Sequence, residues 1–425
     1  MNVLLLGSGG RECTLAWKMS QSPKLSQLFI APGNAGTSLY GKNIAIKETD
    51  FESIADFCNK EQVEMIVVGP EQPLADGIYD YFTSRPELAH ISVIGPSQEG
   101  AKLESSKEFA KEFMKKYGIP TAAYQSFGKN DFEKACDFLK TMQPPYVLKA
   151  DGLAAGKGVI IPDTIEEAEA ALKEMLVNDA FGKAGNRVVI EEFLDGVELS
   201  VFVLTDGKNY LLLPEAKDYK RIGEGNTGLN TGGMGSISPV TFANQDFMNK
   251  VITQIVEPTL LGIQKENIKY SGFIFLGLIK VNGNPYVIEY NVRMGDPETE
   301  SVIPRIENDL LELLVAVRDR KLENEVMKIS SQAATTVMMV SGGYPEDYEK
   351  GFPIEGLNST DSCHVFHAGT SKNSQNQVVT SGGRVLAITA MAETPEEALK
   401  KCYDKAETIK FEKAYYRKDI GFDIL

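Results

Sequence analysis

The chain has 425 residues, 43% hydrophobic and 24% charged, which is typical of a folded protein with about two to four domains. A formal net charge of −15 argues against nonspecific binding to nucleic acid or to an anionic membrane, although a local basic pocket can still hold an anionic substrate. The five cysteines are scattered without a CxxC pair, and no apolar run reaches membrane-spanning length, so we expect a cytoplasmic protein without a zinc site.

Residues 1 to about 100 alternate short apolar strands with helical patterns, the latter around Glu12–Ser20 and Phe51–Glu61. This rhythm is typical of parallel βαβ units, whose ligands gather at the carboxyl ends of the strands. The strands end in glycine-bearing turns, of which the first, Gly7-Ser8-Gly9-Gly10, is a partial dinucleotide fingerprint. Because Glu12 occupies its third glycine position, we favour another phosphate-bearing ligand over a dinucleotide.

A glycine-rich stretch, YVLKADGLAAGKGVII, occupies residues 146–161, after a predicted helix at Ser106–Tyr117 and another near residues 132–142. It resembles a Walker loop, but its spacing is one residue short and Gly158 replaces the Ser or Thr that would hold magnesium. The loop also joins two strands, whereas a Walker loop leads into a helix. We predict a glycine lid over phosphates with Lys149 at its base; a plain hairpin turn is the alternative.

The next segments add carboxylates. After a helix near residues 165–178, the strand RVVIEEF bends at Asp195-Gly196 and continues past Glu198. Such a bend suits the edge of a flat heterocycle, and a carboxylate beyond it suits ribose hydroxyls, although an ordinary β-turn with exposed acids is the alternative.

On a later strand, Glu289 and Asn291 are two residues apart and therefore share a face with Arg293. Carboxylate and amide oxygens suit Mg²⁺.

The remaining chain is predicted to be strand-rich from 191 to about 325, interrupted by the glycine run GEGNTGLNTGGMG and closed by a helix at Asp309–Arg320. The last ~95 residues predict a small α+β domain ending in a helix at Thr394–Ile409. His364 and His367 lie three residues apart on a predicted strand and point to opposite faces, which argues against a shared metal site. With three histidines in all, chemistry based on a histidine base is disfavoured.

The order of lysine strand, glycine flap, acidic hinge and metal strand resembles the ATP-grasp superfamily. The segments GSGGRE, APGNAGT, VGPE, SSK, KADGLAAGKGV, EEFLDGVE, NTGGMGSISP and GDPET resemble the phosphoribosylamine–glycine ligase family, from residue 1 to about Gly421. The resemblance implies an α/β and α+β multidomain fold. Its expected parts are a Rossmann-like parallel-sheet domain at 1–103, a two-lobed ATP-grasp domain at 104–325 with the flap lobe at about 121–190, and an α+β domain at 326–425.

The resemblance also implies an ATP-dependent ligase of purine biosynthesis that joins glycine to 5-phosphoribosylamine through an acyl phosphate. Such chemistry needs positioning and charge neutralisation more than a proton acceptor. It implies ATP-phosphate contacts from Lys107, Lys149, Gly156, Lys157 and Gly158, adenine contacts from Glu191, Glu192, Phe193 and Leu194, and a ribose contact from Glu198. The implied metal ligands for Mg²⁺ or Mn²⁺, expected as two ions, are Glu289 and Asn291.

On the substrate side, the resemblance implies that Asp218 binds the glycine ammonium, while Arg221, Asn230 and Arg293 orient phosphates or the activated carboxylate. Lys149, Asp218 and Arg293 are the implied catalytic residues. Phosphoribosylamine is assigned to Gly9, Gly10, Asn34 and Glu71, and Asp296 and Glu298 to substrate contact or loop structure. The expected partners are small molecules alone, without nucleic acid or membrane, and the expected state is a monomer.

The chain departs from the family pattern at five substrate-side positions: Cys13, Tyr219, Asn226, Leu229 and Glu300. A structural role for Cys13 is favoured over a nucleophilic one, because no basic partner is predicted nearby. Three rival functions stay open. They are an ATP-grasp ligase for bicarbonate or another amino acid, a nucleotide-responsive binding module without turnover, and a nicotinamide dehydrogenase.

Overall fold

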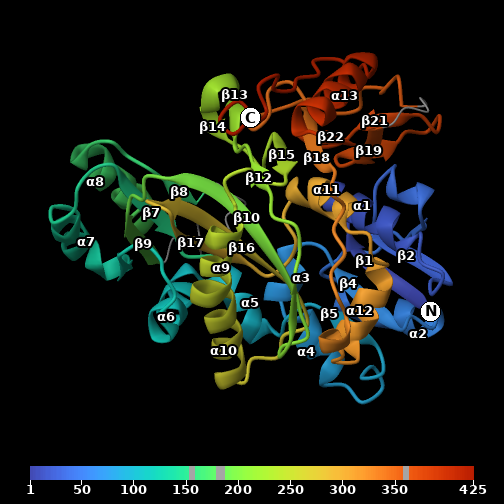
Figure 1. Ribbon diagram of the computed structural model, residues 1–425, viewed down its shortest axis with the longest axis horizontal. Helices are drawn as coiled ribbons and strands as arrows, with labels where there is room; N and C mark the ends of the chain where they lie inside the picture. Colours follow the sequence, from blue (N-terminus) through green and yellow to red (C-terminus); the bar gives the residue numbers. More distant parts are fainter. Residues whose placement is uncertain (153–157, 179–186, 358–362) are drawn as a thin grey trace.

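The computed structural model describes residues 1–152, 158–178, 187–357 and 363–425, and Figure 1 shows how these parts are arranged. The amino-terminal region forms a five-stranded sheet of order β3-β2-β1-β4-β5, and every neighbouring pair is parallel, as the sequence predicts. Its strands are β1 (Asn2–Gly7), β2 (Gln27–Pro32), β3 (Lys42–Asn43), β4 (Met65–Val68) and β5 (Ser92–Ile94). The carboxyl ends of β1, β2 and β4 therefore bring the predicted glycine turns to one edge.

The helices of this region include three that the sequence pattern did not predict, namely α3, α4 and α5. The two that it predicted, α1 and α2, lie close to their expected positions. Asp50 caps α2 by accepting a hydrogen bond from the backbone N–H of Ser53 at 3.2 Å, which explains the start of that helix. The five helices are α1 (Gly10–Met19), α2 (Phe51–Lys60), α3 (Glu71–Ala75), α4 (Ile78–Thr83) and α5 (Gln98–Ser105).

Two four-stranded sheets form the central part of the molecule. The flap lobe, on the left of Figure 1, has the order β6-β9-β7-β8 and carries α7 (Phe132–Leu139) and α8 (Ile165–Leu176). Its strands are β6 (Tyr124–Gly128), β7 (Tyr146–Ala150), β8 (Val159–Ile160) and β9 (Arg187–Glu192). The second sheet has the order β11-β10-β16-β17, with strands β10 (Val197–Thr205), β11 (Tyr210–Leu212), β16 (Gly272–Val281) and β17 (Asn284–Asn291). Helix α6 (Lys107–Tyr117) connects the amino-terminal region to these sheets.

The expectation of a strand-rich segment from 191 to 325 is incomplete. Helices α9 (Gln245–Val251) and α10 (Glu257–Lys265), joined by a π-helical turn at Ile252–Val256, lie within it. Their buried apolar side chains recur at helical spacing and pack into the same core as β10 and β17. These residues are Phe247, Met248, Val251, Ile255, Val256, Leu260 and Ile263. The periodic signal was thus present in the sequence.

The carboxyl-terminal region is built on a five-stranded sheet of order β12-β15-β18-β22-β19. Strands β18 (Ala333–Val340), β19 (Cys363–His367) and β22 (Arg384–Ala392) come from this region, and α13 (Pro395–Thr408) packs on β18 and β22. Strands β12 (Lys217–Asp218) and β15 (Gly235–Ser238) come from the glycine-run segment, and β15 pairs with β18. The sheet therefore ties the predicted substrate loop to the end of the chain.

Smaller elements complete the fold. The glycine run forms a hairpin of β13 (Arg221–Gly223) and β14 (Thr227–Asn230), and β20 (Thr370–Lys372) pairs with β21 (Val378–Thr380). Helix α11 (Glu298–Val302) follows the metal strand, and α12 (Leu310–Arg318) closes the central region. Within the described ranges, no helix is both long and apolar enough to cross a membrane.

Candidate active site

A buried ion-pair cluster joins the base of the flap to the hinge. Glu191, at the end of β9, lies between Lys149 of β7 and Lys111 of α6, at 3.0 and 2.9 Å from their ammonium nitrogens. All three residues are at most 5% exposed. Lys149 also donates to the carbonyl oxygen of Ile288 on β17 at 3.2 Å, so the cluster links both central sheets. Burial alone would raise the pKa of Glu191, but the two lysines hold that pKa below its ordinary value.

The phosphate-side lysine of the sequence prediction, Lys107, lies at the start of α6. Its backbone N–H donates to Asp151 Oδ1 at 2.6 Å, and its Nζ donates to the carbonyl oxygen of Gly152 at 3.1 Å. Burial lowers the pKa of Lys107. On the returning strand, the carbonyl oxygen of Gly158 accepts the N–H of Ala150, which gives the strand–loop–strand geometry expected for a lid. Gly156 and Lys157 lie outside the described residues.

The hinge follows β9. Glu192 accepts the backbone N–H of Ala123 at 2.9 Å through Oε1, while Phe193 is exposed and Leu194 half-buried. Because the carboxylate of Glu191 is used by two lysines, the surface open to a heterocycle is that of Phe193 and Leu194. A Cβ atom built on Gly196 would lie 2.3 Å from the carbonyl oxygen of Lys280, so glycine is required where the chain bends into β10.

A charged crevice lies beyond the hinge, on the face of the sheet that carries Glu198. Lys220 pairs with Glu198 Oε2 at 2.7 Å, and the crevice is lined also by Ser200, Asp218 and Glu289. Burial raises the pKa of Asp218, whereas the nearby Asp218, Glu198 and Glu289 carboxylates raise the pKa of Lys220 against the effect of burial. The predicted glycine-binding carboxylate is therefore placed beside the predicted ribose carboxylate.

Glu298 lies behind this crevice and accepts a hydrogen bond from Ser200 Oγ at 3.0 Å. Burial raises its pKa to about 7, and the Asp218 carboxylate adds to the rise. The sequence pattern left Glu298 between substrate contact and loop structure. Glu298 is only 3% exposed, which favours a role in loop structure, because no open surface remains for a ligand.

The proposed metal strand has the expected geometry. Glu289 and Asn291 alternate with Tyr290 on β17, and Tyr290 instead packs into the core and shares a hydrogen bond with Thr259. Asn291 is 8% exposed, and its Nδ2 has no partner among the described residues. A carboxylate and an amide on one face fit a hard cation such as Mg²⁺, which takes one or two protein oxygens and completes its shell with phosphates and water. The residues present therefore fit the metal.

Arg293 follows on the same stretch and turns towards the amino-terminal region. Its guanidinium pairs with Glu104 at 2.6 Å and with Glu71 at 3.4 Å. The structure thus brings two predicted residues, Arg293 and Glu71, together. It adds Glu104, which the sequence motifs did not indicate, since an isolated Glu in a helix carries no signal. Burial raises the pKa of Glu104, and Arg293 opposes that rise.

The glycine turn at the start of α1 meets Asp296. Asp296 Oδ2 accepts the backbone N–H of Arg11 at 3.3 Å, and Glu12 accepts the N–H of Gly9 at 2.6 Å. The amino end of α1 is thus partly occupied by carboxylates, which weakens the case for a phosphate at Gly9 and Gly10. Asn34 is 7% exposed, and its amide group bonds backbone atoms of Ser8, Gly36, Thr37 and His367.

The departures from the family pattern have defined surroundings. Cys13 accepts the N–H of His367, and burial raises the pKa of its thiol to about 12, which disfavours a thiolate nucleophile. Glu300 is fully buried beside Gly10 and has no hydrogen-bond partner in the described part of the chain; burial raises its pKa well above the ordinary value. Tyr219 donates to Asp423 at 2.8 Å, and Asn226 accepts from Arg417 at 3.0 Å.

The other predicted loop residues lie on the hairpin. Arg221 is paired in register with Asn230, and its guanidinium donates to the carbonyl oxygen of Gly228 at 2.8 Å. Asn230 and the departure Leu229 are exposed. Both predicted residues are therefore on a projecting hairpin, available to a ligand but not packed into the crevice.

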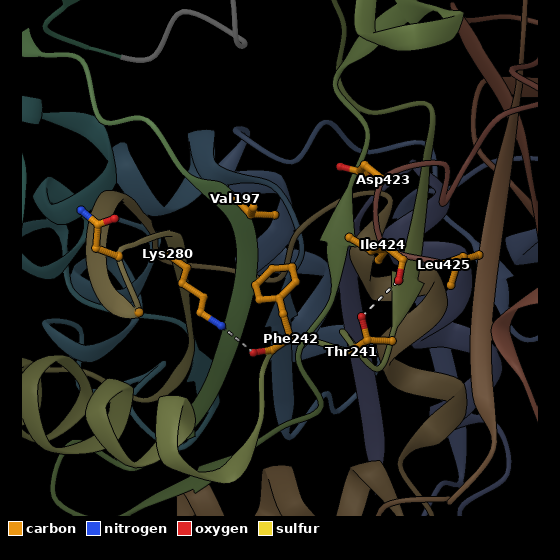
Figure 2. A pocket seen from close by; sticks show the side chains of 9 residues that line it. Val197, Thr241, Phe242, Lys280, Asp423, Ile424 and Leu425 are labelled. Atoms are coloured by element: carbon orange, nitrogen blue, oxygen red, sulfur yellow. Dashed lines mark hydrogen bonds between the residues drawn. The ribbon is translucent and has the colours of Figure 1, made fainter.

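A pocket of about 540 Å³ lies on the other face of the central sheet from Glu198 (Figure 2). Two of its polar side chains are already paired, since Lys280 donates to the carbonyl oxygen of Phe242 at 3.1 Å and Thr241 to that of Ile424 at 3.1 Å. None of the predicted site residues lines it. The lining residues are Val197, Thr241, Phe242, Lys280, Asn282, Gly283, Asp423, Ile424 and Leu425.

Comparison with known proteins finds matches over nearly the whole chain. Models of the N domain, the ATP-grasp (A) domain and the C domain of phosphoribosylglycinamide synthetase match residues 1–104, 105–299 and 334–423. The chain belongs to the phosphoribosylamine–glycine ligase family. It is 45% identical over 426 residues to the phosphoribosylamine–glycine ligase of Pasteurella multocida, covering 99% of this chain and 98% of the relative, and 46% identical over 427 residues to that of Escherichia coli O157:H7, with the same coverage.

Solved structures extend the comparison. The crystal structure of a phosphoribosylamine–glycine ligase from Thermotoga maritima matches with a TM-score of 0.85 and 36% identity, over 99% of this chain and 100% of that one. The biotin carboxylase domain of Hydrogenobacter thermophilus 2-oxoglutarate carboxylase, in complex with MgADP, ADP and bicarbonate, matches with a TM-score of 0.73 at 18% identity, over 97% and 91%. The second likeness shows the fold alone. Family membership confirms the predicted three-part α/β and α+β architecture of an ATP-grasp ligase.

Proposed function

We propose that this chain joins glycine to 5-phosphoribosylamine with ATP, giving glycinamide ribonucleotide, ADP and phosphate in de novo purine biosynthesis. One structural observation supports ATP use above the others. Lys149, at the base of the flap, donates to the carbonyl oxygen of Ile288, the residue before Glu289. Lys107 interacts electrostatically with both Lys149 and Glu289, so the proposed phosphate-binding cations lie near the proposed metal-binding carboxylate. Family membership over nearly the full length supports the choice of substrates.

The reaction runs in two steps. A carboxylate oxygen of glycine attacks the γ-phosphorus of ATP, ADP leaves, and glycyl phosphate forms. The amine of phosphoribosylamine then attacks the carbonyl carbon of glycyl phosphate. The new C–N bond replaces the C–O bond to phosphate, which leaves as the amine gives up a proton to phosphate or water. Positioning and charge neutralisation dominate both steps, in keeping with a site that has no histidine among its predicted members.

Each group of residues has a role in this proposal. Lys107, Lys149 and the flap hold the ATP phosphates, the backbone at 192–194 holds adenine, and Glu198 holds ribose. Glu289 and Asn291 would bind Mg²⁺ or Mn²⁺, which neutralises phosphate charge when present. Asp218 holds the glycine ammonium, while Arg221, Asn230 and Arg293 orient the phosphates or the activated carboxylate as charge develops on them. Phosphoribosylamine lies against Glu71 and Asp296, next to the amino-terminal glycine turns and to Asn34, whose amide is bonded to the protein backbone.

We further propose that the enzyme acts as a cytoplasmic monomer on small molecules, and that its domains divide near residues 103 and 325. The decisive assay measures ADP release with phosphoribosylamine generated in situ, across a panel of carboxylates. Release that requires glycine is expected. Release that requires bicarbonate would instead support a carboxylating ATP-grasp ligase, and saturable ATP binding without phosphate release would support a binding module.

A further inference from the structure

Lys111 is the member of the buried cluster for which neither the sequence motifs nor the proposed function provides a role. It lies one helical turn after Lys107 on α6 and is 2% exposed. Its ammonium group contacts Glu191 Oε2 at 2.9 Å, Thr121 Oγ1 at 2.8 Å and the carbonyl oxygen of Ala122 at 3.5 Å. An ammonium has three N–H donors, so Lys111 has none left for a ligand.

Lys149 differs in this respect. Its ammonium contacts Glu191 Oε1 at 3.0 Å and the carbonyl oxygen of Ile288 at 3.2 Å, which leaves one of its three N–H donors without a partner among the described residues. The two lysines therefore divide one carboxylate, one oxygen each. With both lysines protonated, the cluster carries one net positive charge, and the remaining donor of Lys149 can present that charge to a ligand.

We propose that Lys111 is a positioning residue for ATP binding: it shares Glu191, so that Lys149 meets the phosphates as an uncompensated cation. This rests on the proposed function, because it assumes that ATP phosphates bind at Lys149. If Lys111 were neutral, Glu191 would be fully matched by Lys149, and the cluster would have no net charge. With an effective dielectric constant of about 20, the loss of one positive charge within about 12 Å of the phosphates is expected to weaken ATP binding at least about tenfold.

The surroundings of Lys111 make this charge sensitive to pH. The charged groups that face it are Glu191 and Glu192 from β9 and Lys149 from β7, and the ring of Tyr124 on β6 lies 5.5 Å from its nitrogen. Burial, against the opposing effect of Glu191 and with a smaller contribution from Lys149, lowers the pKa of Lys111 to about 8. Lys111 is therefore protonated at neutral pH and loses its proton as the pH rises through about 8. ATP affinity is expected to fall over the same range.

The test is the dissociation constant of magnesium-saturated ATP, measured by calorimetry between pH 7.5 and 9.5. This whole range lies above the pKa of about 6 of a phosphate monoester, so the phosphates themselves change charge little. Wild type is expected to lose affinity about tenfold across this range. Lys111→Met is expected to bind weakly at every pH, without the wild-type loss between pH 7.5 and 9.5. Lys111→Arg keeps its charge throughout and is expected to bind tightly with little pH dependence.

Burial also lowers the pKa of Lys107, but Lys107 is present in every variant, so the difference between the wild-type and Lys111→Arg profiles isolates Lys111. Lys115→Met, on an exposed position of the same helix, is the matched control and is expected to follow wild type. If the dissociation constant of ATP changes with pH in the same way in wild type and in Lys111→Arg, the role of Lys111 is overturned and the proposed function is left intact. Absence of ATP binding by wild type would overturn both. If Lys111→Met does not fold, the comparison with Lys111→Arg still decides.

Discussion

Arg384 of β22 forms an ion pair with Asp296 at 2.9 Å and also donates to the backbone carbonyl oxygen of Asp296 at 2.7 Å. The same guanidinium donates to the carbonyl oxygen of Gly232 in the glycine run at 2.5 Å. One side chain from the end of the chain therefore fixes two loops that precede the carboxyl-terminal region. Next to it, Gly233 has a φ of +114°, a conformation that favours glycine.

Arg384→Met is expected to raise the KM for phosphoribosylamine, because Asp296 loses its cation and both loops lose an anchor. Breaking a fully buried pair destabilises proteins by about 3–5 kcal/mol; this pair is partly exposed, at 19% and 12% of its side chains, so a smaller fall in the melting temperature is expected as well. The dissociation constant of ATP is expected to stay near the wild-type value. Arg318→Met removes an exposed pair with Asp319 and serves as the control. An unchanged KM for phosphoribosylamine would contradict the anchoring role.

Gly196→Ala is expected to disturb the hinge, since the new methyl group would lie 2.3 Å from the carbonyl oxygen of Lys280. Overpacking of this kind costs roughly 1–3 kcal/mol. Because Val197 and Glu198 pair with the same segment of β16, a rise in the dissociation constant of ATP should accompany the loss of stability. Gly128→Ala meets only an ordinary contact, 3.5 Å from Asp131, and should behave as wild type. Equal effects of the two substitutions would refute the steric argument.

Acid is expected to destabilise the protein through His367. Burial lowers the pKa of this imidazole to about 4, whereas the unfolded chain binds the proton below about 6.5. Between these values the unfolded state holds more protons than the folded state. The contribution of His367 to the free energy of unfolding is therefore full above about pH 6.5 and falls towards pH 4, by at most about 1.4 kcal/mol per pH unit. Urea midpoints at pH 7 and 5 should differ less in His367→Asn, which keeps a polar atom near Thr370, than in wild type. The exposed His90→Asn control should match wild type.

Glu289→Ala is expected to abolish turnover while preserving the fold. Changes to residues that merely support a metal ligand reduce activity about 10- to 100-fold, so loss of the ligand should reduce kcat/KM beyond that range. Glu289→Gln keeps the shape of the side chain and should shift Mg²⁺ activation to higher concentration. Circular dichroism and thermal unfolding without metal test for intact structure. Near-normal turnover in Glu289→Ala would refute the assignment of Glu289 as a metal ligand.

Local periodicity is enough to predict much of the site. Residues two apart on a strand share a face, so the spacing of Glu289 and Asn291 by itself pairs their side chains. The glycine flap joins two strands, whereas a Walker loop leads into a helix, so the sequence also distinguishes these two kinds of loop. Helix positions are predicted to within a few residues at α1, α6 and α13, because each begins near a capping residue or a turn signal.

Only the tertiary structure determined which charged side chains meet. Glu191 was predicted to hold adenine, yet its carboxylate lies between Lys111 and Lys149, more than forty positions apart from each. Arg384 and Asp296 are 88 residues apart, and β15 pairs with a strand that begins at Ala333. Such pairs depend on how distant segments are packed, and no repeat of 2 or 3.6 residues records that information. The sequence determined the family and the faces of its strands, and packing determined how the buried charges are shared.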